Sequence, residues 1–289
     1  MAAFDEPAQA ENWRTWYEKF DENYSPETRR TWYSEAAQAY RQARPRYPDA
    51  MVDDVIRTAG LAANSSVFEI GCGPGIATEA FAKRGLVMQS VEPSPAACEL
   101  ARVACQAYPQ VTVTNSTFED FPLAGQTFDA VLAATSFHWV SPEVACKKSA
   151  EALRPGGSLI LLWATPPQPG VEVCDRIQPI YEQFGLADKI RYQLRDHAYY
   201  KANFDEFAKT IGDSGFFGHT AVEILSYQSH YSVEKYIALL STLSDYIALP
   251  STVRSDLFQA LSDNLQDCVG DKGLAMTHWF GSQVSPVVK

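Results

Sequence analysis

The residues most able to do chemistry lie in the stretch Val67-Phe-Glu-Ile-Gly-Cys-Gly-Pro-Gly75, where an apolar run leads straight into a glycine-rich turn. Glycines let the backbone turn tightly and let a ligand approach without a Cβ in the way. Glu92 ends the next apolar run, about 20 residues beyond Gly71, where a carboxylate can accept hydrogen bonds from both hydroxyls of a ribose. Together these residues predict a site for an adenosine cofactor.

The spacing of the glycines distinguishes between cofactors of this kind. A dinucleotide fingerprint is GxGxxG, whereas Gly71, Gly73 and Gly75 form GxGxG and are followed by Ile76. Glu69 stands two residues before the first glycine, where its charge would repel a pyrophosphate but suits a ligand with ammonium and sulfonium groups. The pattern therefore favours S-adenosylmethionine over a nicotinamide dinucleotide.

Short apolar runs and amphipathic stretches alternate from residue 64 onward. The runs expected to be strands are Val67–Ile70, Leu86–Val91, Val111–Val113, Phe128–Ala134 and Ser158–Trp163. The stretches expected to be helices are Ile76–Arg84, Pro95–Ala107 and Pro142–Leu153. Strands separated by helices of this length form βαβ units, and the carboxyl ends of such parallel strands border one crevice. The glycine-rich turn and Glu92 should therefore lie at the same edge of a sheet.

The rest of the chain is predicted to extend this sheet and to add helices. A mostly helical stretch, Val171–Gly212, precedes a strand at Thr220–Tyr227, and helices at Val233–Ile247 and Thr252–Val269 precede a last strand at Leu274–Val284. The two late strands could pair as an antiparallel edge. The predicted fold class is α/β, a Rossmann-like doubly wound, mostly parallel sheet of seven strands with helices on both faces. Residues 1–48 are interpreted as a helical lid segment and 49–289 as the main domain, with helical additions at 171–212 and 233–269.

Aromatic residues recur through the first 40 residues. Trp13, Trp16, Tyr17 and Phe20 follow i, i+3, i+4, i+7 spacing, so they would form one stripe on a helix. Two interpretations stay open. The stripe could pack against the main domain, or it could belong to a lid whose rings close over a ligand.

Five short motifs occur in a fixed order. They are Glu69-Ile-Gly-Cys-Gly-Pro-Gly75, Val91-Glu-Pro-Ser94, Phe118-Glu-Asp-Phe-Pro122, Phe128-Asp-Ala-Val131 and Leu153-Arg-Pro-Gly-Gly157. With these motifs the chain resembles class I S-adenosylmethionine-dependent methyltransferases of type 11. Within that class, the segments Arg44–Pro48, Ser136–Trp139 and Tyr236–Tyr246 resemble the small-molecule branch that includes trans-aconitate methyltransferase-like proteins.

The resemblance implies which residues would contact the cofactor. Glu69 would orient the methionine amine through the turn, the backbone of Gly71 and Gly73 would hold the methionine part, and Glu92 would hold the ribose. The full set of implied contacts is Tyr40, Glu69, Gly71, Cys72, Gly73, Glu92, Pro93, Thr117, Phe118, Glu119, Ala134 and Thr135. Two positions depart from the family. Thr117 stands where Asp is common, and Ala134 stands where Asn is common, so any contact to the amine there must come from the backbone.

The residues after the fourth strand and before the first helix would face the acceptor. His138 could act as a general base, or it could hold the loop beside the cofactor. Trp139 could form a packing wall or a face for a cation. Arg44 could pair with a carboxylate of the substrate or with an acid of the amino-terminal helix. The predicted catalytic residue is His138, and the predicted substrate contacts are Arg44, Phe137 and Trp139.

The charge of the chain limits its partners. Its 289 residues include 24 Lys and Arg against 35 Asp and Glu, a net charge of −11. A phosphate backbone needs clustered Lys and Arg, so nucleic acid is not expected. No apolar run approaches the roughly 20 residues that cross a bilayer. We expect a small-molecule acceptor, no nucleic acid and no membrane, and the sequence does not indicate an oligomeric state.

A metal site and a secreted location are not expected either. The six cysteines include no CxxC pair and the five histidines no HxxxH pair, whereas zinc sites need clustered ligands. The residues 1–7 lack the basic and apolar regions of a signal peptide. The sequence thus predicts a cytoplasmic methyltransferase that uses S-adenosylmethionine, with an NAD-linked oxidoreductase and a non-catalytic cofactor binder as alternatives.

Overall fold

The computed structural model describes residues 37–187 and 195–288, together with a few positions nearer the amino terminus. Those positions are Trp13, Arg14, Tyr17, Glu18, Glu22, Ser25 and Ser34. Two members of the predicted aromatic stripe, Trp16 and Phe20, lie outside the described residues.

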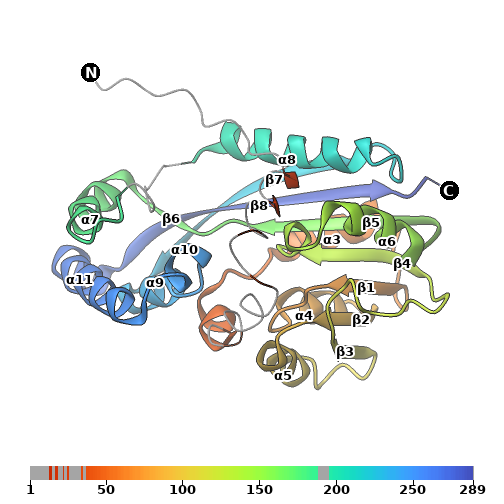
Figure 1. Cartoon of the computed structure of the whole chain (residues 1–289), viewed down its shortest axis with the longest axis horizontal. Coiled ribbons are helices and arrows are strands. Elements are labelled where there is room, and N and C mark those ends of the chain that lie inside the picture. The colour runs from red at the N-terminus through yellow and green to blue at the C-terminus, as the bar shows by residue number, and fades with distance from the viewer. Residues whose placement is uncertain are drawn as a thin grey trace.

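One mixed sheet forms the centre of the molecule (Figure 1). Its strands are β1 (Ser66–Ile70), β2 (Val87–Glu92), β3 (Val111–Asn115), β4 (Phe128–Ala134), β5 (Leu153–Ala164), β6 (Gln168–Pro169), β7 (Ala221–Tyr231) and β8 (Leu274–Pro286). The order is β3-β2-β1-β4-β5-β8-β6, with β7 paired to the other side of β8. The strands β1 to β5 are parallel, and β8 runs antiparallel to its three neighbours. The predicted fold class and the antiparallel edge are confirmed.

The sheet has eight strands rather than the predicted seven. The extra strand is β6, a two-residue segment that pairs with β8 at Met276 and Thr277, beyond the end of β5. A strand this short leaves no apolar pattern in the sequence. The strand β5 also begins earlier than expected, at Leu153, because the pairing with β4 continues past a register shift between Phe128 and Ala130.

Helices cover the sheet and extend beyond it. They are α3 (Asp49–Thr58), α4 (Ile76–Ala82), α5 (Pro95–Ala104), α6 (Pro142–Ala152), α7 (Val171–Gln183), α8 (His197–Asp213), α9 (Val233–Leu240), α10 (Ser244–Ile247) and α11 (Ser251–Val269), with short 3₁₀ turns η1 (Phe137–Trp139) and η2 (Gly270–Lys272). The helix expected over Val233–Ile247 is divided into α9 and α10 by a turn. Among the described residues, no helix has the length and apolar character needed to span a membrane.

Alternate residues of the parallel strands pack into two cores, one on each face. Val131 of β4 contributes to the core under α6 and α8, whereas the next residue, Leu132, contributes to the core under α3 and α4. Both faces of β1, β4 and the second half of β5 are therefore buried, which explains why these strands read as continuous apolar runs. The helices α7, α9, α10 and α11 have a third core of their own, which includes Tyr236 and Leu261. In Figure 1 they lie together at the left, away from β1, β2 and β3.

Candidate functional site

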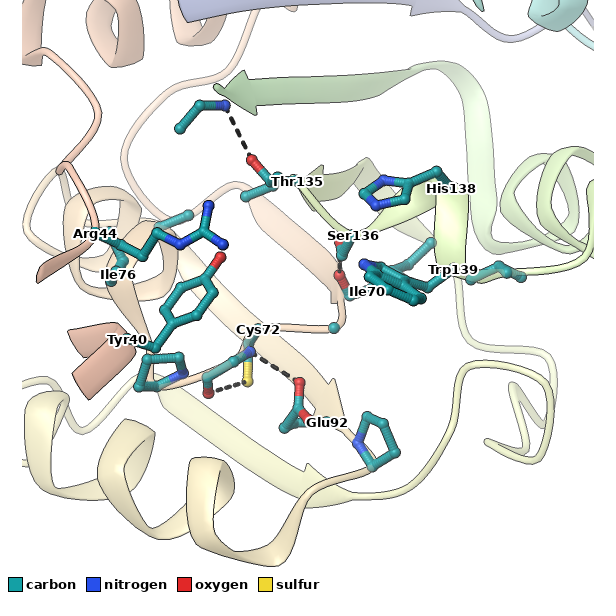
Figure 2. Close-up of a pocket in the computed structure, with 18 of the residues that line it drawn as sticks. Tyr40, Arg44, Ile70, Cys72, Ile76, Glu92, Thr135, Ser136, His138 and Trp139 are labelled. Atoms are coloured by element: carbon teal, nitrogen blue, oxygen red, sulfur yellow. Dashed lines mark hydrogen bonds between the residues drawn. The ribbon is translucent and has the colours of Figure 1, made fainter. Parts of the chain in front are cut away.

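A cavity of about 640 Å³ lies at the carboxyl ends of the parallel strands. The turns after β1, β2, β4 and β5 and the loop after β3 border it, and residues of the 37–47 segment and of the turn before α10 close it. The predicted site residues that line it are Tyr40, Arg44, Gly71, Cys72, Gly73, Glu92, Pro93, Thr117, Phe118, Glu119, Ala134, Thr135, His138 and Trp139. Figure 2 shows Tyr40 and Arg44 on one side and His138 and Trp139 on the other, with Cys72 and Glu92 below them.

The glycine-rich turn between β1 and α4 brings backbone to the cavity without side chains. Gly71 has φ +63°, and a Cβ there would lie 2.9 Å from the Cβ of Ser136, so only glycine fits beside the loop after β4. Gly73 has φ +53°, and no atom lies within 4 Å of the place its Cβ would take. The turn thus leaves open space at Gly73 for a ligand to approach the main chain.

Glu92 ends β2 and supports this turn from below. Its carboxylate accepts hydrogen bonds from the backbone N–H groups of Gly73 and Ser94, both at 2.9 Å. The side chain is 7% exposed and borders the cavity. Burial raises the pKa of this carboxyl, and the two backbone donors act in the opposite direction. Each oxygen has one donor and keeps lone pairs for more, so Glu92 can accept hydrogen bonds from a ligand hydroxyl pair.

Glu69 lies directly beneath the turn and does not line the cavity. It is fully buried, and its Oε2 accepts from Thr78 Oγ1 at 2.6 Å and from Ser90 Oγ at 2.8 Å. Its Oε1 has no hydrogen-bond partner among the residues that the structure describes. Burial raises the pKa of Glu69 to about 7. A cation above the turn would favour the ionised form of this carboxyl.

The loop after β4 holds a strained residue at the edge of the cavity. Thr135 has φ +56°, which is rare for a β-branched side chain. Its Oγ1 accepts from the N–H of Ala164 at 3.0 Å and lies 2.7 Å from the hydroxyl oxygen of Tyr47. The Thr135 hydroxyl therefore accepts a hydrogen bond from β5 at the point where the backbone pairing between β4 and β5 ends. Strained backbone of this kind is often found at binding sites.

The loop after β3 forms another wall of the cavity. Thr117 Oγ1 donates to Asp120 Oδ2 at 2.8 Å and accepts from the N–H of Asp120 at 3.1 Å, which closes a tight turn. Phe118 is 3% exposed, and its ring packs against Phe68 with centroids 5.8 Å apart. The ring of Phe118 therefore joins the cavity wall to the core.

His138 and Trp139 line the cavity together, with ring centroids 5.0 Å apart. Burial lowers the pKa of His138 to about 4, so its imidazole is neutral at pH 7 and is a weak base. Cys72 also borders the cavity, and burial raises the pKa of its thiol well above the usual value. It stays protonated and behaves as a small apolar group.

The prediction for Phe137 needs correction, because this residue does not line the cavity. It is fully buried, and its ring packs against Trp13 and Phe207 with centroids 5.2 and 6.4 Å apart. The 3₁₀ turn η1 points neighbouring side chains to different sides, so Phe137 faces the core while His138 faces the cavity. Trp13 also packs on the main domain, and its Nε1 donates to the His138 carbonyl at 3.3 Å. In contrast, Tyr17 borders the cavity.

Arg44 extends from the end of the amino-terminal segment toward the turn between α9 and α10. Its Nε donates to Thr242 Oγ1 and its Nη2 to the Thr242 carbonyl, both at 2.9 Å. The expected alternative, an ion pair with an acid of the amino-terminal helix, is not found among the described residues. Its neighbours Arg41 and Arg46 instead pair with Glu79 of α4.

Several cavity residues are not among the predicted site residues. They are Tyr17, Ala37, Pro45, Tyr47, Ile70, Pro74, Ile76, Ala77, Asp120, Ser136, Val140, Ala164, Pro166, Leu243 and Ser244. Tyr47 stands in the Arg44–Pro48 motif, so that motif was a usable signal. Leu243 and Ser244 stand in the Tyr236–Tyr246 segment, which was a usable signal as well. The part of the chain that the structure describes holds no group of three or more His, Cys, Asp or Glu able to bind a metal ion.

A comparison with known proteins identifies the family that this part of the chain matches. Residues 68–161 match the sequence profile of a family described as a methyltransferase domain. The chain carries a methyltransferase domain. That domain contains the glycine-rich turn, Glu92 and the loop with His138, so the resemblance inferred from the motifs is confirmed.

Relatives of this methyltransferase domain share about half of their length with the chain. A protein of Mycobacterium tuberculosis named as an uncharacterized methyltransferase is 38% identical over 130 residues, which is 45% of this chain and 51% of the relative. A demethylmenaquinone methyltransferase of Tropheryma whipplei is 30% identical over 106 residues, 35% of this chain and 43% of the relative. The structure of a candidate type II methyltransferase from Anaeromyxobacter dehalogenans has a TM-score of 0.61 at 21% identity, covering 84% of this chain and 97% of that one. This last likeness shows the shared fold.

Proposed function

We propose that this protein is an S-adenosylmethionine-dependent methyltransferase that methylates a small organic acceptor by direct displacement. One observation carries the proposal. The buried Glu92 carboxylate and the open space at Gly73 lie together at the carboxyl ends of β1 and β2, inside the methyltransferase domain. A ribose acceptor beside bare main chain is what an adenosine cofactor requires.

The residues of the cavity fit S-adenosylmethionine. Its volume of about 640 Å³ lies within the usual range of small-molecule sites, roughly 300–1,000 Å³. Glu92 would hold the ribose, and the loop at Thr117 and Phe118 would border the adenine. The methionine part would lie against the open face of Gly73. The carboxyl of Glu69 beneath the turn would then offset positive charge above it.

When bound, the cofactor supplies a methyl group on a positively charged sulfur, which is transferred in a single displacement. The protein's own contribution is then to hold two reactants in line, which can lower a barrier by about 7–11 kcal/mol. His138 is a neutral imidazole near this point because burial lowers its pKa to about 4. We assign it a positioning role, in which it gives or accepts a hydrogen bond without becoming charged.

The amino-terminal segment belongs to this site in the proposal. Tyr17, Tyr40, Arg44 and Tyr47 all line the cavity, so residues 1–48 would form a lid over the domain at 49–289, with helical additions at 171–212 and 233–269. Such elements exclude water and shape the space for an acceptor. Cofactor binding should therefore slow amide exchange at residues 40–46 of this segment.

The acceptor class and the location are also proposed. A net charge of −11 disfavours nucleic acid, and the name of the Tropheryma relative refers to a small molecule. All six cysteines are unpaired, as in the reducing cytoplasm. We therefore place the enzyme in the cytoplasm with a small-molecule acceptor.

A turnover assay tests the proposal. The purified protein is incubated with methyl-labelled S-adenosylmethionine and a panel of acids, phenols, amines and lipids. The expected result is label in one class of acceptor, with one S-adenosylhomocysteine formed per methyl transferred. Cofactor binding without transfer to any acceptor would favour a non-catalytic binder. Binding of NAD in place of S-adenosylmethionine would favour an oxidoreductase.

A further inference from the structure

One side chain of α6 binds the main chain of the loop after β3. Lys148 Nζ donates to the Glu119 carbonyl at 2.8 Å and to the Phe121 carbonyl at 2.7 Å. The same nitrogen lies 5.3 Å from the centroid of the Phe118 ring. A single ammonium group therefore contacts Phe118, Glu119 and Phe121 of this loop.

The chemistry of lysine suits this position. An ammonium group has three N–H donors, so it can bond two carbonyls and still present positive charge to the face of a ring. Burial lowers the pKa of Lys148, and the charges of Glu119, Asp120 and Glu151 act in the opposite direction. These acids favour the ammonium form, whose hydrogen bonds to carbonyls are stronger than those of a neutral donor.

The other described contacts of the loop fix its internal turn and its apolar side. Thr117 exchanges hydrogen bonds with Asp120, and its carbonyl accepts from the N–H of Phe121 at 3.2 Å. The ring of Phe121 packs against Phe68 in the core, with centroids 5.1 Å apart. Neither contact involves the two carbonyls that Lys148 binds, so Lys148 sets the direction of those carbonyls.

The loop that Lys148 holds is a wall of the cavity. Thr117, Phe118, Glu119 and Asp120 all line the cavity, whereas Lys148 does not. Lys148 can therefore act on a bound ligand only through the loop. The main-chain N–H groups of Phe118 and Glu119 have no hydrogen-bond acceptor among the described residues, so they are unused donors beside the cavity.

We propose that Lys148 is a positioning residue for the adenine of the cofactor. By holding two carbonyls toward α6, it keeps the Phe118 ring and the N–H groups of the loop where a purine binds. This inference rests on the proposed function, which places adenine beside this loop. It assigns the preference of the site for a purine base to a residue that touches no ligand.

The test compares a ligand that carries the base with one that lacks it. S-adenosylhomocysteine and S-ribosylhomocysteine, which has no adenine, are titrated into the full protein and followed by ligand-observed NMR. Lys148→Met keeps the length of the side chain and removes its donors and charge. Lys148→Gln keeps an amide donor without the charge, and is the second variant if the first does not fold. Lys147→Met is the matched control, because Lys147 is exposed on the same helix.

We expect Lys148→Met to raise the Kd for S-adenosylhomocysteine about five- to twentyfold and to leave that for S-ribosylhomocysteine within about twofold, because the ammonium bonds act on the base alone. Lys148→Gln should weaken S-adenosylhomocysteine at least about threefold, and Lys147→Met should match the wild type. An unchanged Kd for S-adenosylhomocysteine in the Lys148 variants, or an equal loss for both ligands, would overturn the inference. Failure of the wild type to bind S-adenosylhomocysteine would instead overturn the proposed function.

Discussion

Replacing Glu92 by alanine should weaken cofactor binding sharply. The bound cofactor would lose two hydrogen bonds from its ribose hydroxyls to the carboxylate, each worth about 1.5–3 kcal/mol because the acceptor is charged. Their sum, about 3–6 kcal/mol, corresponds to roughly a 10²- to 10⁴-fold rise in Kd. Water entering from the cavity would offset part of the loss, so we expect about 100-fold for S-adenosylhomocysteine, measured by calorimetry.

The same variant removes the acceptor of two backbone N–H groups, those of Gly73 and Ser94. Part of the weaker binding could therefore come from a looser turn, and a second ligand separates the two effects. A 2′,3′-dideoxy analogue of S-adenosylhomocysteine should bind the wild type weakly and lose little more in Glu92→Ala. Glu99→Ala, on the exposed side of α5, is the control and should leave Kd unchanged. A change below threefold for Glu92→Ala, or an equal loss for both ligands, would refute the ribose contact.

Four further outcomes are expected. The pKa of Glu69 is raised to about 7, and a cationic ligand favours its ionised form, so the affinity for S-adenosylmethionine should rise between pH 6 and 8 with release of a proton. Calorimetry in buffers of different ionisation enthalpy would show the proton release, and Glu69→Gln should remove both the release and the pH dependence. EDTA should leave turnover unchanged, and restoration of a lost activity by zinc or magnesium would contradict that expectation. Phe137→Ala should cost about 3–5 kcal/mol in denaturant unfolding and leave the Kd for cofactor within threefold, because its ring lies in the core. Amide exchange at residues 40–46 should slow when S-adenosylhomocysteine is added, and unchanged exchange would argue against a lid.

The elements that make the cofactor end of the site could be predicted because they are local. Each is a strand followed by a turn, and parallel order brings the ends of β1 and β2 to one edge. Gly73 and Glu92 therefore meet across 19 positions of sequence, as their spacing predicted. The two-residue strand β6 carries no such signal, because its pairing with β8 decides it. The turn between α9 and α10 has no such signal either.

The acceptor end could be predicted only in part. Arg44 was recognised as a candidate, but its partner Thr242 lies 198 positions away, and no periodicity links the two. Phe137 was misplaced because its side of the cavity depends on the direction of one 3₁₀ turn. The strain at Thr135 runs against the preference of a β-branched residue, so tertiary contacts with Tyr47 and Ala164 must impose it.

Native mass spectrometry would show whether the cavity holds S-adenosylmethionine. The purified wild-type protein is mixed with equal concentrations of S-adenosylmethionine and NAD and sprayed under conditions that keep complexes intact. We expect a single added mass, that of one S-adenosylmethionine per chain, which Glu92→Ala largely loses and Glu99→Ala retains. A complex with NAD, or no retained cofactor in the wild type at concentrations that saturate known sites of this kind, would contradict it.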